Sequence, residues 1–346
     1  MQVTRAQLLE RVRVLDGGLG TLLESRGHDL GSELWSARLL LERPEAVREA
    51  HADFLAAGAE IAISASYQVS AEGLSARGLN RGAADAVLAA SVRLAREARD
   101  AHGGGLVAAS LGPYGAMLAD GSEYRGDYPI RGAALRDWHR ARVEVLAAAG
   151  ADLLAAETIP SLDEVRAIAE AVRGTGAATW ISVTADRGAL RTGEPLAEAY
   201  AIAASVPEVV AIGVNCCDPA EVLPAIEAAR ATGLAFVAYP NSGEQWDAKN
   251  RQWIGAPGFP DRLVTDWLDA GARLVGGCCR VGTAEVGGIA AIVAAREHPV
   301  RERQEGRRDG RPLPAIPPAS GALAAVAREV GYPRMPTDLS ENHRRR

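Results

Sequence analysis

One local pattern of apolar and polar residues recurs along the chain. An amphipathic helix is followed by a small-residue turn with glycine and then by a short apolar run, as in residues 51–67, 142–158, 225–241 and 264–279. The turn glycines fit the left-handed backbone just past a helix end, where a side chain would clash; they are Gly58, Gly150, Gly233 and Gly271. Because the apolar runs barely alternate, each predicts a strand that is buried on both faces, as in a parallel sheet covered by helices.

Counting such apolar runs predicts eight strands. They centre near Val14, Ile63, Val107, Leu154, Ile181, Ile212, Val237 and Val275. About 260 residues that hold eight strand–helix units match the size of a (β/α)8 barrel, or TIM barrel. An open doubly wound sheet could be built from the same pattern. The segment DGGLGTLLE lacks the glycine spacing of a dinucleotide-binding loop, so we favour an α/β fold with a TIM barrel.

The composition changes near residue 300. Residues 1–300 hold the strand–helix pattern and are predicted to form the barrel as a single domain. Residues 301–346 are rich in arginine and proline and show little apolar periodicity. We therefore expect an irregular, mobile C-terminal tail, or an arm that packs on a neighbouring chain.

Composition and charge narrow the classes of partner. The 346 residues are 48% hydrophobic and carry a formal net charge of −6, which favours neither nucleic acid nor an anionic membrane as partner. No stretch reaches the roughly 18 uncharged apolar residues of a membrane helix, and the N-terminus lacks a signal-peptide core. We expect a cytoplasmic protein with reduced thiols. Lys249 is the only lysine and lies in a polar stretch, which disfavours Schiff-base mechanisms.

Polar residues end the predicted strands, where the active site of a TIM barrel lies. Asp16 ends the first run, and Glu157 ends the fourth. The remaining candidates follow the second, third, fifth, sixth and eighth runs; they are Ser66, Tyr67, Gln68, Ser110, Thr184, Asn215, Cys216, Cys278 and Cys279. This convergence on one mouth is what a small-molecule site needs.

The four cysteines form two adjacent pairs, each at the end of a predicted strand. Sulfurs from Cys216 and from the pair Cys278 and Cys279 could meet at metal-ligand distance, although adjacent cysteines are also common as small core residues. Three thiolates with an open fourth position would suit zinc and favour a sulfur ligand. Cys217 is expected to face away from Cys216. Cys278 and Cys279 can both bind a metal only if the chain turns there, as Gly276 and Gly277 allow.

Several motifs together resemble the zinc-dependent homocysteine S-methyltransferases. They are LDGGLGT, LWSARLL, ISASYQVS, SLGPYGAMLADGSEY, LLAAETIPS, IGVNCCDP, AYPNSGEQWD and GGCCRVG, between about residues 12 and 293. The SYQ, GPYGA and YPNSGE segments are similar to the branch that uses S-methylmethionine. The resemblance implies a TIM barrel, a Zn²⁺ ion held by Cys216, Cys278 and Cys279, and contacts of Asp16 and Glu157 with the ammonium of homocysteine. Cys217 departs from the non-thiol residue that is usual at its position.

The implied reaction transfers a methyl group from a sulfonium donor to homocysteine thiolate at the zinc and forms methionine. The implied donor is S-methylmethionine, with S-adenosylmethionine as a substitute. Aromatic faces attract a sulfonium cation, and the candidate rings are Trp35, Tyr67, Tyr114 and Trp253. Hydroxyl and amide groups of Ser66, Tyr67, Ser110 and Asn215 could bind the amino-acid part of a substrate. They could equally satisfy backbone groups at strand ends, and the two carboxylates could cap helices.

Two other functions fit parts of the pattern. Betaine is an alternative methyl donor. A non-catalytic barrel that binds zinc or senses oxidants through its paired cysteines is an alternative from another class. Cobalamin- or folate-dependent transfer normally needs further domains, for which this chain has no room.

Overall fold

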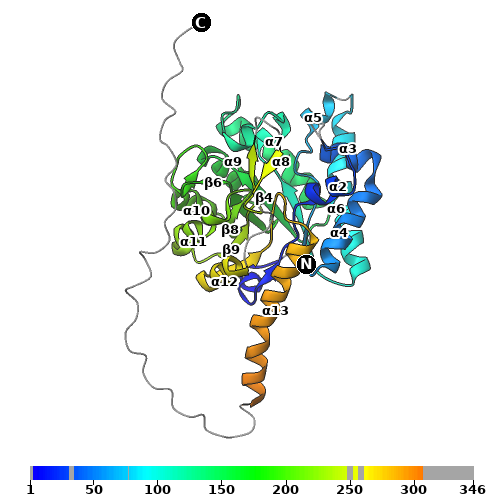
Figure 1. Cartoon of the computed structure of the whole chain (residues 1–346). Coiled ribbons are helices and arrows are strands. Elements are labelled where there is room, and N and C mark those ends of the chain that lie inside the picture. The colour runs from blue at the N-terminus through cyan, green and yellow to red at the C-terminus, as the bar shows by residue number, and fades with distance from the viewer. Residues whose placement is uncertain (1–2, 31–34, 77, 248–251, 256–260, 307–346) are drawn as a thin grey trace. The chain divides into compact units, whose positions relative to one another are not determined.

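The structure is a computed structural model of the chain, and it describes residues 3–30, 35–76, 78–247, 252–255 and 261–306 (Figure 1). Lys249 lies outside these residues. In the described part of the chain, no helix is long and apolar enough to cross a membrane.

Eight parallel strands form the barrel, and each contains or adjoins one predicted strand centre. They are β1 (Arg13–Val14), β2 (Ile61–Ile63), β3 (Leu106–Leu111), β4 (Leu153–Ile159), β5 (Thr179–Val183), β8 (Val209–Asn215), β9 (Ala235–Tyr239) and β12 (Ala272–Val275). Their order in the sheet is β1-β12-β9-β8-β5-β4-β3-β2. A parallel bridge between Leu15 and Ile61 joins the two ends of the sheet. The predicted TIM barrel is therefore confirmed.

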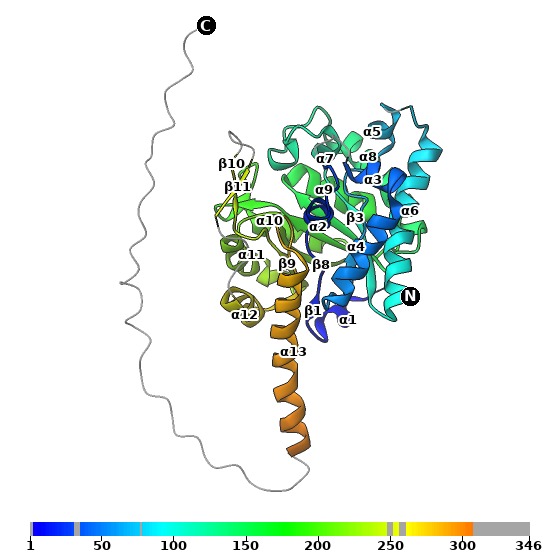
Figure 2. The same cartoon turned by 45° about the vertical axis from the view of Figure 1, so that its right-hand side comes forward.

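Helices surround the strands (Figures 1 and 2). The longer ones are α3 (Trp35–Glu42), α4 (Pro44–Ala56), α6 (Arg81–His102), α8 (Gly132–Ala148), α9 (Leu162–Val172), α10 (Leu196–Ala204), α11 (Val222–Ala229), α12 (Asp261–Ala270) and α13 (Thr283–Gly306). Short helices are α1 (Arg5–Leu9), α2 (Leu19–Ser25), α5 (Ala71–Ser75), α7 (Tyr114–Leu118), η1 (Ser122–Tyr124), η2 (Pro219–Glu221) and η3 (Arg230–Thr232). The predicted turn glycines all have positive φ, from 65° at Gly233 to 119° at Gly271.

Two hairpins lie outside the barrel sheet. Strand β6 (Ala185–Asp186) pairs with β7 (Ala189–Leu190), and β10 (Gln245–Asp247) pairs with β11 (Gln252–Ile254).

The core has two apolar layers, one on each face of the strands. In β3, Val107 and Ala109 belong to the layer between the sheet and the helices, whereas Ala108 belongs to the layer inside the barrel. The inner layer also contains Leu8 of α1 and the large ring of Trp180. Because apolar side chains fill the barrel interior, open space for a ligand is found at the carboxyl ends of the strands.

Helix α13 runs to Gly306, past the predicted boundary at residue 300. By internal contacts the chain divides into residues 1–299 and 300–346. Residues 307–346 lie outside the described part of the chain, so the mobile tail stays a prediction.

Candidate metal and substrate site

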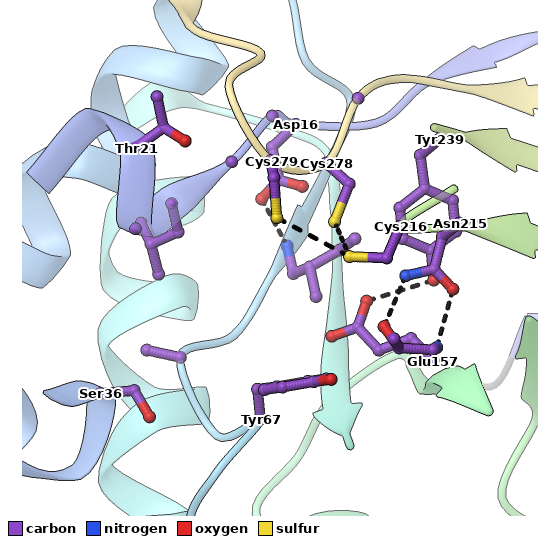
Figure 3. A pocket seen from close by; sticks show the side chains of 18 of the residues that line it. Asp16, Thr21, Ser36, Tyr67, Glu157, Asn215, Cys216, Tyr239, Cys278 and Cys279 are labelled. Carbon is purple, nitrogen blue, oxygen red and sulfur yellow. Dashed lines mark hydrogen bonds between the residues drawn. The ribbon is translucent and has the colours of Figure 1, made fainter. Parts of the chain in front are cut away.

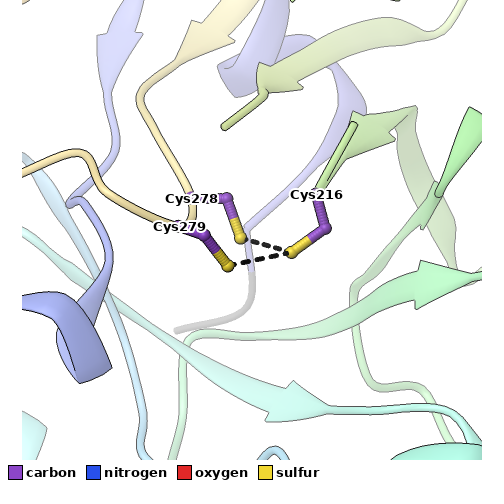
Figure 4. Close-up of side chains that lie close together, drawn as sticks. All are labelled: Cys216, Cys278 and Cys279. Carbon is purple, nitrogen blue, oxygen red and sulfur yellow. Dashed lines mark hydrogen bonds between the residues drawn. The ribbon is translucent and has the colours of Figure 1, made fainter. Parts of the chain in front are cut away.

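Three cysteine sulfurs meet at the mouth of the barrel (Figure 4). The Sγ of Cys216 lies 2.6 Å from that of Cys278 and 3.9 Å from that of Cys279. All three Sγ atoms lie within 4.8 Å of one another. Cys217 is buried in the outer apolar layer and is not among the residues that line the site cavity. The predicted convergence of three sulfurs, with Cys217 facing away, is confirmed.

Two local features of the backbone bring these sulfurs together. Strand β8 ends at Asn215, and Cys216 follows in the left-handed region with a φ of 49°. Strand β12 ends at Val275, and the chain then turns through Gly276 and Gly277. A Cβ atom on Gly277 would lie 2.1 Å from the Val281 side chain, so only glycine fits this close passage. The turn that would allow both Cys278 and Cys279 to point into the site is therefore present.

The loop after β9 holds the cysteine turn in place. The backbone N–H of Cys278 donates to the carbonyl of Pro240 at 2.8 Å, and that of Cys279 donates to Asn241 Oδ1 at 3.1 Å. The N–H of Ser242 donates in return to the carbonyl of Cys279 at 3.1 Å. These hydrogen bonds fix two of the three sulfurs through the backbone, independently of any ligand.

The donor set suits a metal ion. Hydrogen bonds with Cys216 and Cys279, together with burial, raise the pKa of Cys278, and hydrogen bonds from Cys216 and Cys278 lower the pKa of Cys279. The cluster thus favours one shared negative charge, and a cation among the sulfurs is needed to stabilise three thiolates. Tetrahedral zinc holds its sulfur ligands roughly 3.8 Å apart, which matches the Cys216–Cys279 separation, while the Cys216–Cys278 pair is closer.

Two buried carboxylates lie beside the sulfurs (Figure 3). Asp16 is 2% exposed; its Oδ2 accepts a hydrogen bond from the Ile63 N–H at 2.7 Å, and its Oδ1 has no partner among the described residues. Burial raises the pKa of Asp16 well above its usual value. Glu157 accepts hydrogen bonds from Ser110 Oγ and, at 3.2 Å, from the Tyr239 hydroxyl, and burial raises its pKa to about 7. Both groups would be stabilised as carboxylates by a bound cation that donates hydrogen bonds.

A bulge in β4 aims Glu157 into the site. The register of β4 against β5 shifts between Ala156 and Ile159, and Thr158 lies in the left-handed region with a φ of 62°. Asn215 Oδ1 accepts a hydrogen bond from the Thr158 N–H at 2.7 Å, and Asn215 Nδ2 donates to Thr158 Oγ1 at 2.8 Å. The side-chain amide of Asn215 is thus bonded to Thr158, the residue that follows Glu157.

A cavity of about 280 Å³ connects the sulfurs with the carboxylates. Tyr67 and Asn215 line it, as the sequence predicts. Ser66 and Ser110 are fully buried and are not among its described lining residues. Ser66 Oγ donates to the Ser110 carbonyl at 2.7 Å, and Ser110 Oγ donates to Glu157. The two serines therefore lie behind the cavity lining and bond to protein groups, which is one of the two alternatives that the sequence offered for them.

The predicted aromatic wall is only partly present. Tyr67 lines the cavity. Tyr114 instead packs against Tyr128 and against Trp138 of α8, with ring centroids 5.5 and 5.0 Å away. The side chains of Trp35 and Trp253 lie outside the described part of the chain.

Arg142 is a buried residue that the sequence did not single out. It lies on α8, is 4% exposed, and donates hydrogen bonds to the carbonyls of Tyr67, Val69 and Gly112 at 3.1, 3.0 and 2.8 Å. Its guanidinium stacks on Trp138 at 4.6 Å from the ring centroid. Burial lowers its pKa to about 10, so it is charged at neutral pH. Arg142 thus ties the loop that carries Tyr67 to the loop after β3.

The sequence predicted no role for several residues that line the cavity, two of which, Ser64 and Tyr239, lie at strand ends. They include Thr21, Ser36, Ser64, Glu123, Tyr124 and Tyr239. The segment ADGSEY, which holds Glu123 and Tyr124, was noted as a motif but was assigned no role.

A barrel with three convergent thiols and two buried carboxylates at its carboxyl-end mouth defines a TIM-barrel enzyme with a thiolate metal site. The profile of the family described as homocysteine S-methyltransferase matches residues 13–293. The homocysteine S-methyltransferase of Escherichia coli K12 is 45% identical over 293 residues, which cover 81% of this chain and 94% of that protein. YbgG, a homocysteine S-methyltransferase of Bacillus subtilis, is 41% identical over 294 residues, 80% of this chain and 93% of its own.

A solved structure agrees with this likeness. The metallated form of the homocysteine methyltransferase MmuM from Escherichia coli superposes with a TM-score of 0.73 and 42% identity, and the match covers 82% of this chain and 96% of that one. The chain belongs to the homocysteine S-methyltransferase family and is a methyltransferase. The family resemblance of the sequence motifs is thereby confirmed.

Proposed function

We propose that the protein transfers a methyl group from a sulfonium donor to the sulfur of homocysteine and so forms methionine. S-Methylmethionine is the proposed donor, and S-adenosylmethionine is a substitute. The observation that carries the proposal is the meeting of three cysteine sulfurs and two buried carboxylates in one cavity of about 280 Å³. One small substrate can thus reach the sulfurs with its thiol and the carboxylates with its ammonium.

Cys216, Cys278 and Cys279 are the proposed ligands of a Zn²⁺ ion. When bound there, zinc supplies the positive charge that keeps a coordinated substrate thiol in its reactive thiolate form at neutral pH. A soft set of three sulfurs favours a fourth sulfur over an oxygen ligand. The metallated form of MmuM supports a metal at this site, and the sulfur donors support zinc as the metal.

Asp16 and Glu157 are proposed to bind the ammonium group of homocysteine. The free Oδ1 of Asp16 offers an acceptor, and the hydrogen bonds to Glu157 from Ser110 and Tyr239 fix the direction of its carboxylate. An ammonium between the two groups offsets the burial, and the smaller repulsion from Glu157, that raise the pKa of Asp16. Because Asp16 follows β1 and Glu157 lies on β4, they orient the substrate from two sides of the mouth.

The reaction is balanced without an external acid. The homocysteine thiolate forms a bond to the methyl carbon while the bond from that carbon to the donor sulfur breaks. The electron pair of that bond stays on the donor sulfur, which leaves as a neutral thioether. The ring of Tyr67 attracts the sulfonium cation, and the cavity holds the two sulfurs in line.

The test combines metal content with activity in the same samples. Zinc is measured in the purified, reduced protein and in Cys278→Ser, and methionine formation is followed with S-methylmethionine, S-adenosylmethionine or betaine. We expect about one zinc per chain, and the loss of both metal and activity in the variant. Faster transfer from betaine would overturn the proposed donor. A metal-free protein with undiminished transfer would overturn the role of zinc, and bound zinc with no transfer from any donor would favour a metal-binding sensor.

A further inference from the structure

Glu123 contributes a third carboxylate to the cavity, next to Asp16 and Glu157. It lies on the short helix η1, in the segment between β3 and α8. Its Oε2 atom is buried and has no hydrogen-bond partner among the described residues. Burial raises the pKa of Glu123, and the hydrogen bond from its own backbone N–H and the charge of Arg125 offset this rise only in part.

The loop around Glu123 is fixed without using the carboxylate. A Cβ atom on Gly115 would lie 2.3 Å from the backbone nitrogen of Glu123, so the turn packs directly on helix α7. The neighbouring cation Arg125 is taken by Asp127, at 3.1 Å, and by Asp120. Glu123 therefore has a defined place in the cavity wall and, in the described part of the chain, no salt-bridge partner.

The charges of the two substrates account for this third carboxylate; this step rests on the proposed function. Homocysteine brings one ammonium, for which Asp16 and Glu157 are already assigned. A sulfonium amino acid brings a second ammonium in addition to its sulfonium. A sulfonium has no N–H to donate, and an aromatic face such as Tyr67 suits it. The buried Oε2 atom of Glu123, which has no hydrogen-bond partner among the described residues, instead requires an N–H donor.

We propose that Glu123 binds the α-ammonium group of the methyl donor. The cavity thereby selects sulfonium donors that carry an amino-acid group over donors that carry only a methylated cation. Glu123 is in this sense the specificity-determining residue for the donor, and it distinguishes an amino-acid sulfonium from betaine, which has no N–H.

The test uses Glu123→Gln with Glu144→Gln as a matched control, an exposed carboxylate on α8 outside the described cavity lining. Two donors are compared: S-methylmethionine and 4-(dimethylsulfonio)butanoate, which is S-methylmethionine without its amino group. If the second is not turned over, its inhibition constant against S-methylmethionine is measured. We expect Glu123→Gln to raise KM for S-methylmethionine by roughly 10- to 100-fold, since it removes a charged hydrogen bond formed in both ground and transition states.

The remaining constants should change little. KM for homocysteine, kcat and the affinity for the desamino donor should stay within about threefold in Glu123→Gln. All constants should stay within about threefold in Glu144→Gln. Glu123→Asp, which keeps the charge, should fall between wild type and Glu123→Gln. Thermal unfolding establishes that each variant folds.

Two results would overturn the assignment of Glu123. One is an unchanged KM for S-methylmethionine in Glu123→Gln, and the other is an equal loss with both donors, which would indicate a general charge effect. Failure of the proposed function gives a different result, because the wild-type protein would then form no methionine from homocysteine and S-methylmethionine.

Discussion

The side-chain amide of Asn215 forms two hydrogen bonds with Thr158, one from its backbone N–H at 2.7 Å and one to its hydroxyl at 2.8 Å. Thr158 is a β-branched residue with a φ of 62°, a conformation that such residues rarely adopt. The residue before it is Glu157, whose carboxylate lines the cavity. A residue at the end of β8 therefore controls the direction of a carboxylate on β4.

We expect Asn215→Ala to lower the free energy of unfolding by about 2 kcal/mol, because it leaves buried polar groups of Thr158 unpaired. It should also raise KM for homocysteine about tenfold, since Glu157 loses its defined direction. Urea unfolding and initial rates measure the two effects. Adding Thr158→Gly should recover about 1 kcal/mol in the Asn215→Ala background, because glycine tolerates the left-handed conformation. No recovery would mean that strain at Thr158 is not what Asn215 compensates.

Removal of the metal should abolish methyl transfer, and Zn²⁺ should restore it. The ligands can be counted without activity by loading Co²⁺ and measuring its thiolate charge-transfer absorption in the near ultraviolet. Cys279→Ser should reduce this absorption, because it removes one sulfur from the cluster. Cys217→Ala is the matched control, and it should keep both absorption and activity because Cys217 packs in the outer apolar layer. A loss of absorption in Cys217→Ala would show that the fourth cysteine binds the metal.

Arg142→Lys should destabilise the protein by at least about 2 kcal/mol, since one ammonium cannot replace a planar group that donates to several buried carbonyls. KM for the sulfonium donor should rise, because two of those carbonyls belong to Tyr67 and Val69, at the end of the loop after β2. Arg136→Met on the same helix is the control. Arg136 makes only half-exposed ion pairs, so its variant should change stability by less than about 1 kcal/mol. Equal losses in both variants would contradict a specific role of Arg142.

His51 should make stability depend on pH. It is fully buried on α4, neither ring nitrogen has a hydrogen-bond partner among the described residues, and burial lowers its pKa to about 4. Above pH 6.5 the ring is neutral in both the folded and the unfolded chain. Below it, the unfolded chain takes up a proton that the folded chain refuses until about pH 4, so acid favours unfolding.

The comparison of wild type with His51→Leu isolates this effect. Between pH 7.5 and pH 5, the wild-type free energy of unfolding should fall by about 2 kcal/mol more than that of the variant. Urea denaturation at the two pH values measures it, with the metal content held constant. Parallel pH dependences would mean that His51 is protonated in the folded protein.

The parts of the structure that the sequence predicts are those that depend on local pattern. Apolar runs after helices that end in glycine predicted all eight strands, and strand ends predicted the meeting of Cys216 with Cys278 and Cys279. The sequence left open whether Ser66 and Ser110 face the cavity, for a physical reason. A strand that is buried on both faces has no polar alternation to reveal which residue faces the cavity. Glu123 and Arg142 could not be found, because their contacts join segments that only the folded chain brings together.

The order of the strands has a consequence for biosynthesis. Cys278 and Cys279 follow β12, which pairs with β9 on one side and with the first strand, β1, on the other. Until this last strand has been synthesised and inserted, the growing chain offers only one of the three sulfurs. A stable metal site thus forms only in a finished barrel, and its formation adds binding energy to the folded state. Only completed chains would then bind the metal ion, and truncated chains would be inactive.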